Sequence, residues 1–258
     1  MTKQRRGIQS IELGGRLLHA LAQAGEPMML RDLAREAGMT AAKAHPYLTS
    51  FIRIGLVEQN AVTGRYEFGP LALQLGIVTL RRMAPVRIAT PIVAALADEI
   101  DHAVSLSVWG AHGPTIVLLE EPGQPVHIAM RVGSTAALLE TATGRAFAAF
   151  LPSKLIETAL RENLDRLSVG YNPARRKTID LNKTLAEVRR RGLARAVGDP
   201  LPGINAFAAP VFDHTGTAVL VITAMGPTGT FDADWKSPIA QAVVRAAGTI
   251  SRQLGAKV

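Results

Sequence analysis

The sequence contains no catalytic or metal-binding arrangement at a spacing that would support such chemistry. It has no cysteine, which excludes disulfides, thiolate catalysis and cysteine-based metal sites. Its six histidines stand apart, without the spacing that places two metal ligands on one face of a helix. The serine elbow of hydrolases, the phosphate-binding loop and the dinucleotide fingerprint are also missing from the sequence. We therefore expect no catalytic activity, no cofactor and no bound metal.

The stretch TATGRAF, which begins at Thr141, is the best candidate for binding a small ligand. Small residues precede an apolar run there, so we expect a helix to start near Gly144. The first turn of a helix has free N–H groups and the positive end of the helix dipole, and it can bind a carboxylate without a charged side chain. An ordinary glycine-bearing helix start explains the same pattern, and both interpretations stay open.

Three other polar stretches are better explained by structure than by chemistry. The acid and histidine at Asp213 and His214 precede a glycine and indicate a turn between two strands rather than a catalytic pair. The basic runs at residues 175–177 and 189–191 are expected to be solvated helix ends rather than a second nucleic-acid surface.

Positive charge is concentrated in the first third of the chain. The 258 residues include 29 Lys and Arg against 21 Asp and Glu, and residues 1–82 hold 11 of the basic and 6 of the acidic ones. A small basic domain joined to a larger, nearly balanced one indicates that the first part binds a polyanion. A basic surface that merely keeps the protein soluble is the alternative.

Membrane insertion and secretion are not expected. No apolar run approaches the roughly 20 residues that a membrane span needs. The charged residues 1–7 are not followed by the apolar region of a secretory signal. We therefore expect a cytoplasmic protein with no membrane partner.

Three short helices are predicted before Gly55. The first has Ser10 as its N-cap, the second ends at Gly38, and the third runs from an N-cap at Thr40 to Arg53. Two helices joined by so short a turn match the helix-turn-helix, whose second helix lies in the major groove of DNA.

A β-hairpin is predicted directly after the three helices. Its strands are expected within residues 56–59 and 65–68, with Gly64 at the turn. Three helices and a hairpin make a winged helix-turn-helix. A plain helical bundle with an added hairpin is the alternative.

Pro46 stands inside the expected third helix, where proline removes a hydrogen bond and clashes with the preceding turn at a cost of roughly 3 kcal/mol. We expect an irregular or extended start to this helix, with Pro46 near the beginning of its regular part. A mild kink in an otherwise ordinary helix is the alternative.

The rest of the chain indicates an α+β domain on a mostly antiparallel sheet. Two helical segments broken near Pro85 lead into strands predicted over residues 103–110, 114–122 and 126–132, helices over 153–163 and 180–191, strands over 193–199, 204–212 and 217–226, and a closing helix over 234–254. Strands in two blocks with helices between and after them are typical of the α+β class.

In the order and spacing of several stretches, the chain resembles the IclR family of bacterial transcription regulators over nearly its whole length. These stretches include LRDLAREAGMTAAKAHPYLTSFIRIGLVE, TATGRAFAAFLP and RRRGLARAVGDPLPGINAFAAPVFD. The resemblance implies a winged helix-turn-helix DNA-binding domain over residues 1–69, a linker helix over 70–83, and a GAF-like effector-binding and oligomerisation domain over 84–258. It also implies that a homodimer or homotetramer binds pseudo-palindromic operator DNA and a small carboxylic acid effector.

The resemblance assigns DNA contacts to the N-terminal arm, the third helix and the wing. The family usually has a phosphate-binding arginine where this chain has Pro46, so one backbone contact should be missing. The positive charges are expected on phosphates, with Tyr47 and Ser50 at base edges. The predicted DNA-binding residues are Arg5, Arg6, Lys43, Tyr47, Ser50, Arg53 and Arg65.

The effector contacts implied by the resemblance have lost most of their polarity. Relatives that bind small polar acids have an aspartate where this chain has Ala196 and a cysteine where it has Ala206. They have serines where this chain has Thr223 and Met225. An apolar pocket with few polar groups favours an aromatic or hydrophobic acid over a compact, hydrated one. The predicted effector-binding residues are Ala142, Thr143, Gly144, Ala196, Ala206, Thr223 and Met225.

The sequence therefore predicts a ligand-responsive transcription regulator. One alternative is a ligand-binding or enzymatic module whose N-terminal domain serves only oligomerisation. Another is an architectural DNA-binding protein without an effector.

Overall fold

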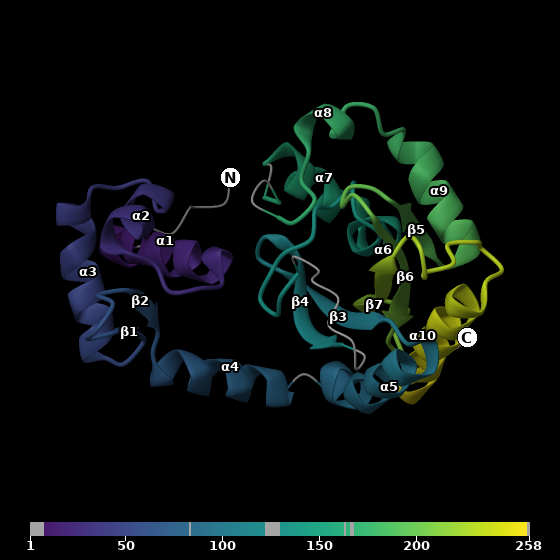
Figure 1. Cartoon of the computed structure of the whole chain (residues 1–258), viewed down its shortest axis with the longest axis horizontal. Helices are drawn as coiled ribbons and strands as arrows, with labels where there is room; N and C mark the ends of the chain where they lie inside the picture. Colours follow the sequence, from purple (N-terminus) through teal and green to yellow (C-terminus); the bar gives the residue numbers. More distant parts are fainter. Residues whose placement is uncertain (1–7, 83, 122–129, 163, 166–167, 257–258) are drawn as a thin grey trace. The chain divides into compact units, whose positions relative to one another are not determined.

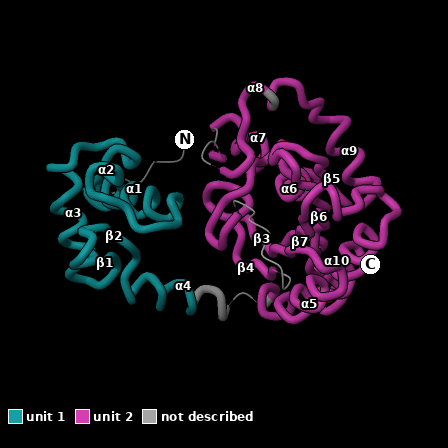
Figure 2. Tube along the Cα trace, in the orientation of Figure 1, with its two compact units in different colours: residues 1–82 teal, residues 83–258 magenta. Residues whose placement is uncertain are grey.

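The computed structural model describes residues 8–82, 84–121, 130–162, 164–165 and 168–256. The chain divides into two compact units between Arg82 and Met83, shown in different colours in Figure 2. Each unit has its own buried core, so the two are described separately.

The first unit contains three helices, a two-stranded hairpin and a fourth helix (Figure 1). They are α1 (Gln9–Ala24), α2 (Leu30–Glu36), α3 (Ala41–Arg53), β1 (Val57–Gln59), β2 (Tyr66–Phe68) and α4 (Pro70–Arg82). Leu17, Leu33 and Leu48, one from each of the first three helices, lie at the centre and are no more than 1% exposed. The hairpin strands pair antiparallel. The predicted winged helix-turn-helix fold is confirmed.

Pro46 lies within a regular helix. The hydroxyl of Thr40 caps α3 by accepting the backbone N–H of Lys43 at 3.3 Å, and the helix continues through Pro46 without interruption. The expected irregular start is therefore wrong. The hydrogen bond that proline removes would have ended on the carbonyl of Ala42. Because Ala42 and Pro46 are both exposed, that carbonyl can be hydrated instead.

Within its described residues, the second unit is built on a five-stranded sheet. Its strands are β3 (Ala103–Gly110), β4 (Gly113–Glu120), β5 (Ala194–Val197), β6 (Ile204–Phe212) and β7 (Ala218–Pro227). The strand order is β4-β3-β7-β6-β5, and every neighbouring pair is antiparallel. The predicted α+β class with an antiparallel sheet is confirmed.

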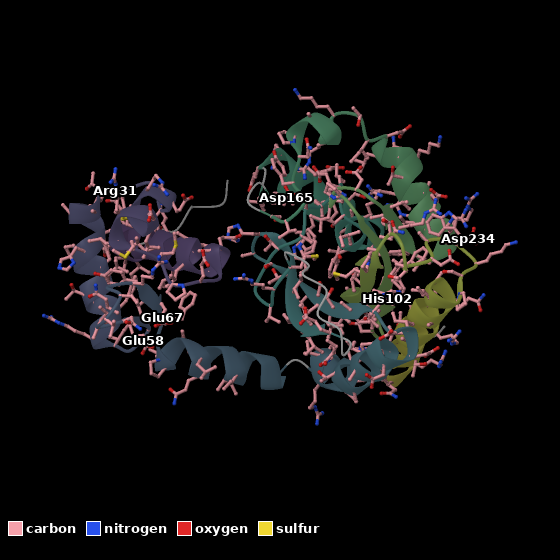
Figure 3. The ribbon with its side chains drawn as sticks, viewed as in Figure 1. Arg31, Glu58, Glu67, His102, Asp165 and Asp234 are labelled. Atoms are coloured by element: carbon pink, nitrogen blue, oxygen red, sulfur yellow. The ribbon has the colours of Figure 1, made fainter. Side chains whose placement is uncertain are left out.

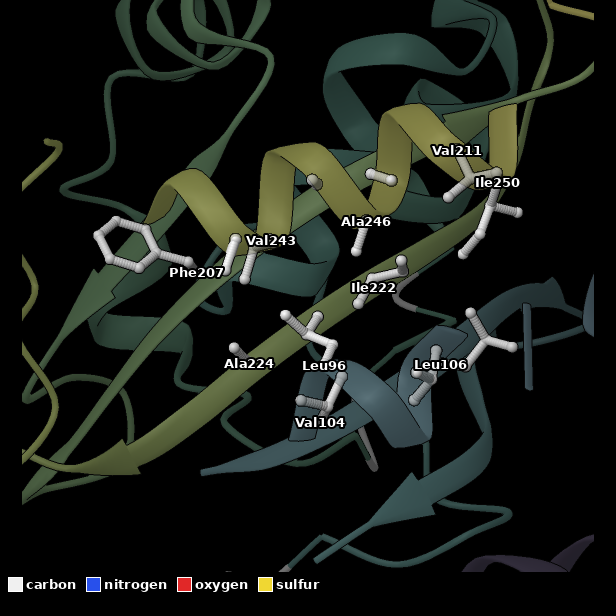
Figure 4. Packing of buried hydrophobic residues seen from close by; sticks show 14 of the residues in the cluster. Leu96, Val104, Leu106, Phe207, Val211, Ile222, Ala224, Val243, Ala246 and Ile250 are labelled. Carbon is white, nitrogen blue, oxygen red and sulfur yellow. The ribbon is translucent and has the colours of Figure 1, made fainter. Parts of the chain in front are cut away.

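Helices cover both faces of the sheet. On one face, α5 (Ala84–Ile100) and α10 (Pro238–Gln253) bury a large apolar cluster, and Figure 4 shows Val243 and Ile250 of α10 in it with Ile222 of β7. On the other face, α6 (Ala142–Phe150) packs on β6 and β7. The remaining helices of this unit are α7 (Ser153–Arg161), α8 (Pro173–Arg176) and α9 (Leu181–Arg191).

Several local expectations differ from the structure. Ser10 lies inside α1, whose N-cap is Ile8, and the closing helix begins at Pro238 after its cap Ser237. No strand forms over residues 130–132, and residues 126–129 of that predicted strand lie outside the described residues. The turn at Asp213 is confirmed, because its carboxylate accepts the backbone N–H of Thr215 at 2.8 Å.

None of the described helices is both long and apolar enough to cross a bilayer.

Replacing Pro46 with alanine should stabilise α3, because the new N–H can donate to the carbonyl of Ala42. The gain has an upper bound of about 3 kcal/mol. We expect slower amide hydrogen exchange across α3 by mass spectrometry. The control is Pro70→Ala: Pro70 is the first residue of α4, where no intrahelical bond is missing, so exchange in α4 should not slow. Unchanged or faster exchange in α3 would contradict the account of Pro46.

Candidate functional site

The exposed side of α3 carries three of the predicted DNA-binding residues, Lys43, Ser50 and Arg53. The hydroxyl of Ser50 donates to the carbonyl of Pro46 at 2.9 Å, so its oxygen remains able to accept a hydrogen bond. Neither Lys43 nor Arg53 forms an ion pair within the described part of the chain. Their charges are therefore available to phosphates.

Two other predicted DNA-binding residues also hold the first unit together. Tyr47 is half-buried against α1, where a Cβ on Gly14 would lie 3.3 Å from Cδ1 of Tyr47. The guanidinium of Arg65 donates to the carbonyl of Pro27 at 2.9 Å. If Tyr47 or Arg65 contacts DNA, it must do so while keeping these contacts within the first unit. Arg5 and Arg6 lie outside the described residues.

Arg31, labelled in Figure 3, is a basic residue near the helix-turn-helix turn that our sequence analysis did not include. It is exposed on the first turn of α2 and lines a surface hollow of about 530 Å³ together with Gly38 and Thr40. Its place on the first helix of the motif was the available signal. The positive surface around α3 therefore extends onto α2.

Helix α6 starts two residues earlier than expected. It begins at Ala142, and the hydroxyl of its N-cap Thr141 accepts the N–H of Gly144 at 2.9 Å. The N–H groups of Ala142 and Thr143 have no acceptor among the described residues, so the positive end of the helix dipole has unpaired donors there. Gly144 has a packing role, because a Cβ would collide with the carbonyl oxygen of Ala137.

The other predicted effector residues lie on the sheet face that α6 covers. Ala196 pairs with Ala206, which pairs on its other side with Met225. Thr223 lies in the next row, and its hydroxyl is 2.8 Å from that of Thr143, which joins α6 to β7. The structure thus brings the predicted residues together. All of them except Ala206 are buried, so the site is closed.

A buried ion-pair cluster fixes the chain that leads into α6. The guanidinium of Arg176 lies 2.9 Å from Oε2 of Glu140 and 2.5 Å from Oδ2 of Asp165, and the two acidic side chains are at most 2% exposed. Asp165 accepts the N–H of Leu138 at 2.7 Å, and Glu140 accepts that of Leu139 at 3.1 Å. These carboxylates therefore hold the backbone just before α6.

The ionisation of Arg176 follows from its two partners. Burial alone would lower the pKa of Arg176, but hydrogen bonds to Asp165 and Glu140 and their negative charges outweigh burial and raise it. The expectation of solvated basic helix ends is wrong for Arg176. It holds for Arg189, which is exposed in the last turn of α9 while it donates to the carbonyl of Ala149 at 2.6 Å. Sequence reasoning missed the cluster because Glu140 is 36 positions from Arg176.

Replacing Arg176 with alanine should leave two buried carboxylates without their cation. Breaking a buried pair in this way costs about 3–5 kcal/mol, so we expect a clear loss of stability in urea unfolding monitored by circular dichroism. The control is Arg161→Ala, because Arg161 pairs with Glu162 at 3.6 Å on the surface and its removal should change stability little. Equal effects of the two substitutions would refute the structural role of Arg176.

Comparison with known proteins assigns the family. The profile for the bacterial transcriptional regulator IclR C-terminal matches residues 78–252, and the profile for the IclR helix-turn-helix domain matches residues 10–61. The chain is similar to the glycerol operon regulatory protein of Streptomyces griseus, with 30% identity over 97% of this chain and 98% of that protein. It is similar to the transcriptional repressor IclR of Escherichia coli, with 24% identity over 96% and 90% of the two chains.

Solved structures show the same fold. The crystal structure of Pseudomonas aeruginosa HmgR is 34% identical, with a TM-score of 0.60 over 97% of this chain and 99% of that one. An IclR homologue from Microbacterium hydrocarbonoxydans, complexed with 4-hydroxybenzoate, is 19% identical, with a TM-score of 0.73 over 95% and 98% of the chains. The curated relatives are transcriptional regulators rather than enzymes. The chain belongs to the IclR family of bacterial transcriptional regulators.

Proposed function

We propose that this regulator binds a pseudo-palindromic operator through α3 and the hairpin, and that its affinity for the operator changes when an aromatic or otherwise hydrophobic carboxylic acid binds beside α6. The observation that carries the ligand class is the start of α6, where free N–H groups lie over a sheet face lined by alanine and methionine. Such a regulator acts in the cytoplasm, where the DNA is.

The DNA-binding part of the proposal is supported by the surface of α3. The second helix of a helix-turn-helix lies in the major groove, which places the exposed side of α3 against DNA. Lys43 and Arg53 would bind phosphates there, and the remaining acceptor capacity of Ser50 would meet a base edge. Pro46 brings no charge to this surface, so its part of the helix relies on shape alone.

Dimerisation is supported by the surface of α4. This helix has a group of exposed apolar side chains, which soluble monomers seldom leave uncovered. They are Leu73, Leu75, Ile77 and Val78, each at least 42% exposed. We propose that a second copy of the chain covers them in a dimer or a tetramer. A two-fold axis between the two copies would pair their recognition helices with the two halves of a palindrome.

The effector part of the proposal is supported by the pairing of one anion-binding point with apolar surroundings. The N–H groups of Ala142 and Thr143 would bind the carboxylate. Ala196, Ala206 and Met225 would contact the body of the ligand, and a thioether suits an aromatic ring. The homologue with 4-hydroxybenzoate is distant and shares the fold. The argument for the ligand class therefore rests on the residues of this chain.

Replacing Lys43 or Arg53 with alanine should reduce the salt dependence of DNA binding. Each phosphate contact contributes about 0.9 to the slope of log affinity against log salt, so losing one per subunit should lower a dimer's slope by about 1.8. We would measure it by fluorescence anisotropy on a duplex that the wild-type protein selects from a random library. Arg161→Ala, on α7 of the second unit, is the matched control. A slope that stays at the wild-type value would remove these residues from the DNA contact.

A further inference from the structure

Two serine hydroxyls on β3 are buried without a hydrogen-bond partner. Ser105 and Ser107 are both 0% exposed, and neither Oγ has a partner among the described residues. Leaving a buried hydroxyl unpaired costs about 1–3 kcal/mol, and such groups are rare in native proteins. Two of them, two positions apart on one strand, call for a physical explanation.

Strand register places both serines on the face of the sheet that α6 covers, where the effector site is proposed. Ser105 is directly opposite Thr223 on β7, and Ser107 is opposite Val221. Directly opposed residues in an antiparallel pair point to the same face. Val104 and Leu106, which alternate with the serines, belong to the apolar cluster under α5 and α10 on the other face.

The serines extend a group of hydroxyls that α6 completes. Thr223, the neighbour of Ser105 across the strands, forms its hydroxyl pair with Thr143 of α6. One hydrogen bond between two hydroxyls leaves one O–H and further lone pairs unused. The rows around this group are filled by small side chains, with Ala208 beside Thr223 and Ala103 two positions before Ser105. These small side chains occupy little volume beside the hydroxyls, although the site is closed in this structure.

We propose that Ser105 and Ser107 form a second polar subsite of the effector site, which binds an uncharged hydroxyl group on the ligand's apolar body. This inference rests on the proposed function, which places the ligand's carboxylate at the start of α6. A serine hydroxyl both donates and accepts, and a phenolic or alcoholic hydroxyl complements both capacities. A second carboxylate is disfavoured, because a hydroxyl group brings no compensating positive charge into a buried site. The preferred ligand is therefore a hydroxylated aromatic acid.

A buried water molecule could occupy the space beside the two serines instead of a ligand hydroxyl. The water explanation and the ligand explanation make opposite predictions for the stability of the ligand-free protein. If a permanent water satisfies the serines, replacing them with alanine removes its hydrogen bonds and lowers stability. If the hydroxyls await a ligand, the same replacement removes an unpaired polar group and leaves stability unchanged or raised. In the second case, replacing a serine with alanine lowers the affinity for the hydroxylated ligand without lowering the stability of the free protein.

The test measures the full chain, wild type, Ser105→Ala and Ser107→Ala, by isothermal titration with benzoate and with the 2-, 3- and 4-hydroxybenzoates. Thermal unfolding of each protein without ligand is recorded in parallel. The matched control is Ser251→Ala, because Ser251 on α10 is a buried serine whose hydroxyl donates to the carbonyl of Ala247 at 2.8 Å. Phenol serves as a probe that has the hydroxyl without the carboxylate.

We expect wild-type protein to bind one hydroxybenzoate about 3- to 10-fold more tightly than benzoate, the range that one neutral hydrogen bond supplies. Ser105→Ala or Ser107→Ala should remove this preference, leave benzoate affinity unchanged, and not lower the melting temperature. Ser251→Ala should lower the melting temperature and keep the preference.

Three results would overturn the subsite: no preference in the wild type, a preference that survives both substitutions, or a lower melting temperature with ligand affinities unchanged. If benzoate still binds in any of these cases, the proposed carboxylate site at the start of α6 stands and only the hydroxyl subsite is refuted. If phenol binds in a serine-dependent way and no acid binds, the subsite stands and the carboxylate assignment fails. If no probe binds, both are refuted.

Discussion

The guanidinium of Arg176 lies between two buried carboxylates, and the position of the chain that leads into α6 depends on it. Without that cation, Glu140 and Asp165 would be two like charges in a region of low dielectric, and the backbone that they hold before α6 would move. The start of α6 would lose its position over the sheet. The close contact at Gly144 and the hydroxyl bond between Thr143 and Thr223 depend on that position.

Charge balance explains how two buried carboxylates can lie close to the helix end that we propose as the carboxylate site. Glu140 and Asp165 would repel an anionic ligand, but Arg176 bonds to both, and the guanidinium of Arg145 donates to the backbone carbonyls of Leu139 and Glu140 at 2.7 and 3.0 Å. Two positive charges thus oppose two negative ones. An anionic ligand at the proposed site would therefore meet the dipole of α6 in a locally neutral environment, where uncharged N–H donors would bind its carboxylate.

The sequence was sufficient for the features that repeat along the chain and insufficient for those that depend on distant residues. The period-two pattern along the chain predicted β3 and β6 to the residue, because consecutive residues carry that pattern. Pro46 was misjudged because the cost of its missing hydrogen bond was overestimated: Ala42 is exposed, so its carbonyl can be hydrated. The Arg176 cluster and the unpaired hydroxyls of Ser105 and Ser107 depend on contacts between residues far apart in the sequence, which no local pattern predicts.

The central claim is that ligand binding in the second unit changes DNA affinity through the first. The most direct test titrates a fluorescent operator duplex with the protein, with and without a saturating amount of the benzoate derivative that binds most tightly. The account predicts a change of about 5–150-fold in operator affinity, and by linkage the same factor in ligand affinity when operator is bound. Equal operator affinity in both titrations would show that the ligand and DNA sites are not coupled, and would contradict the account.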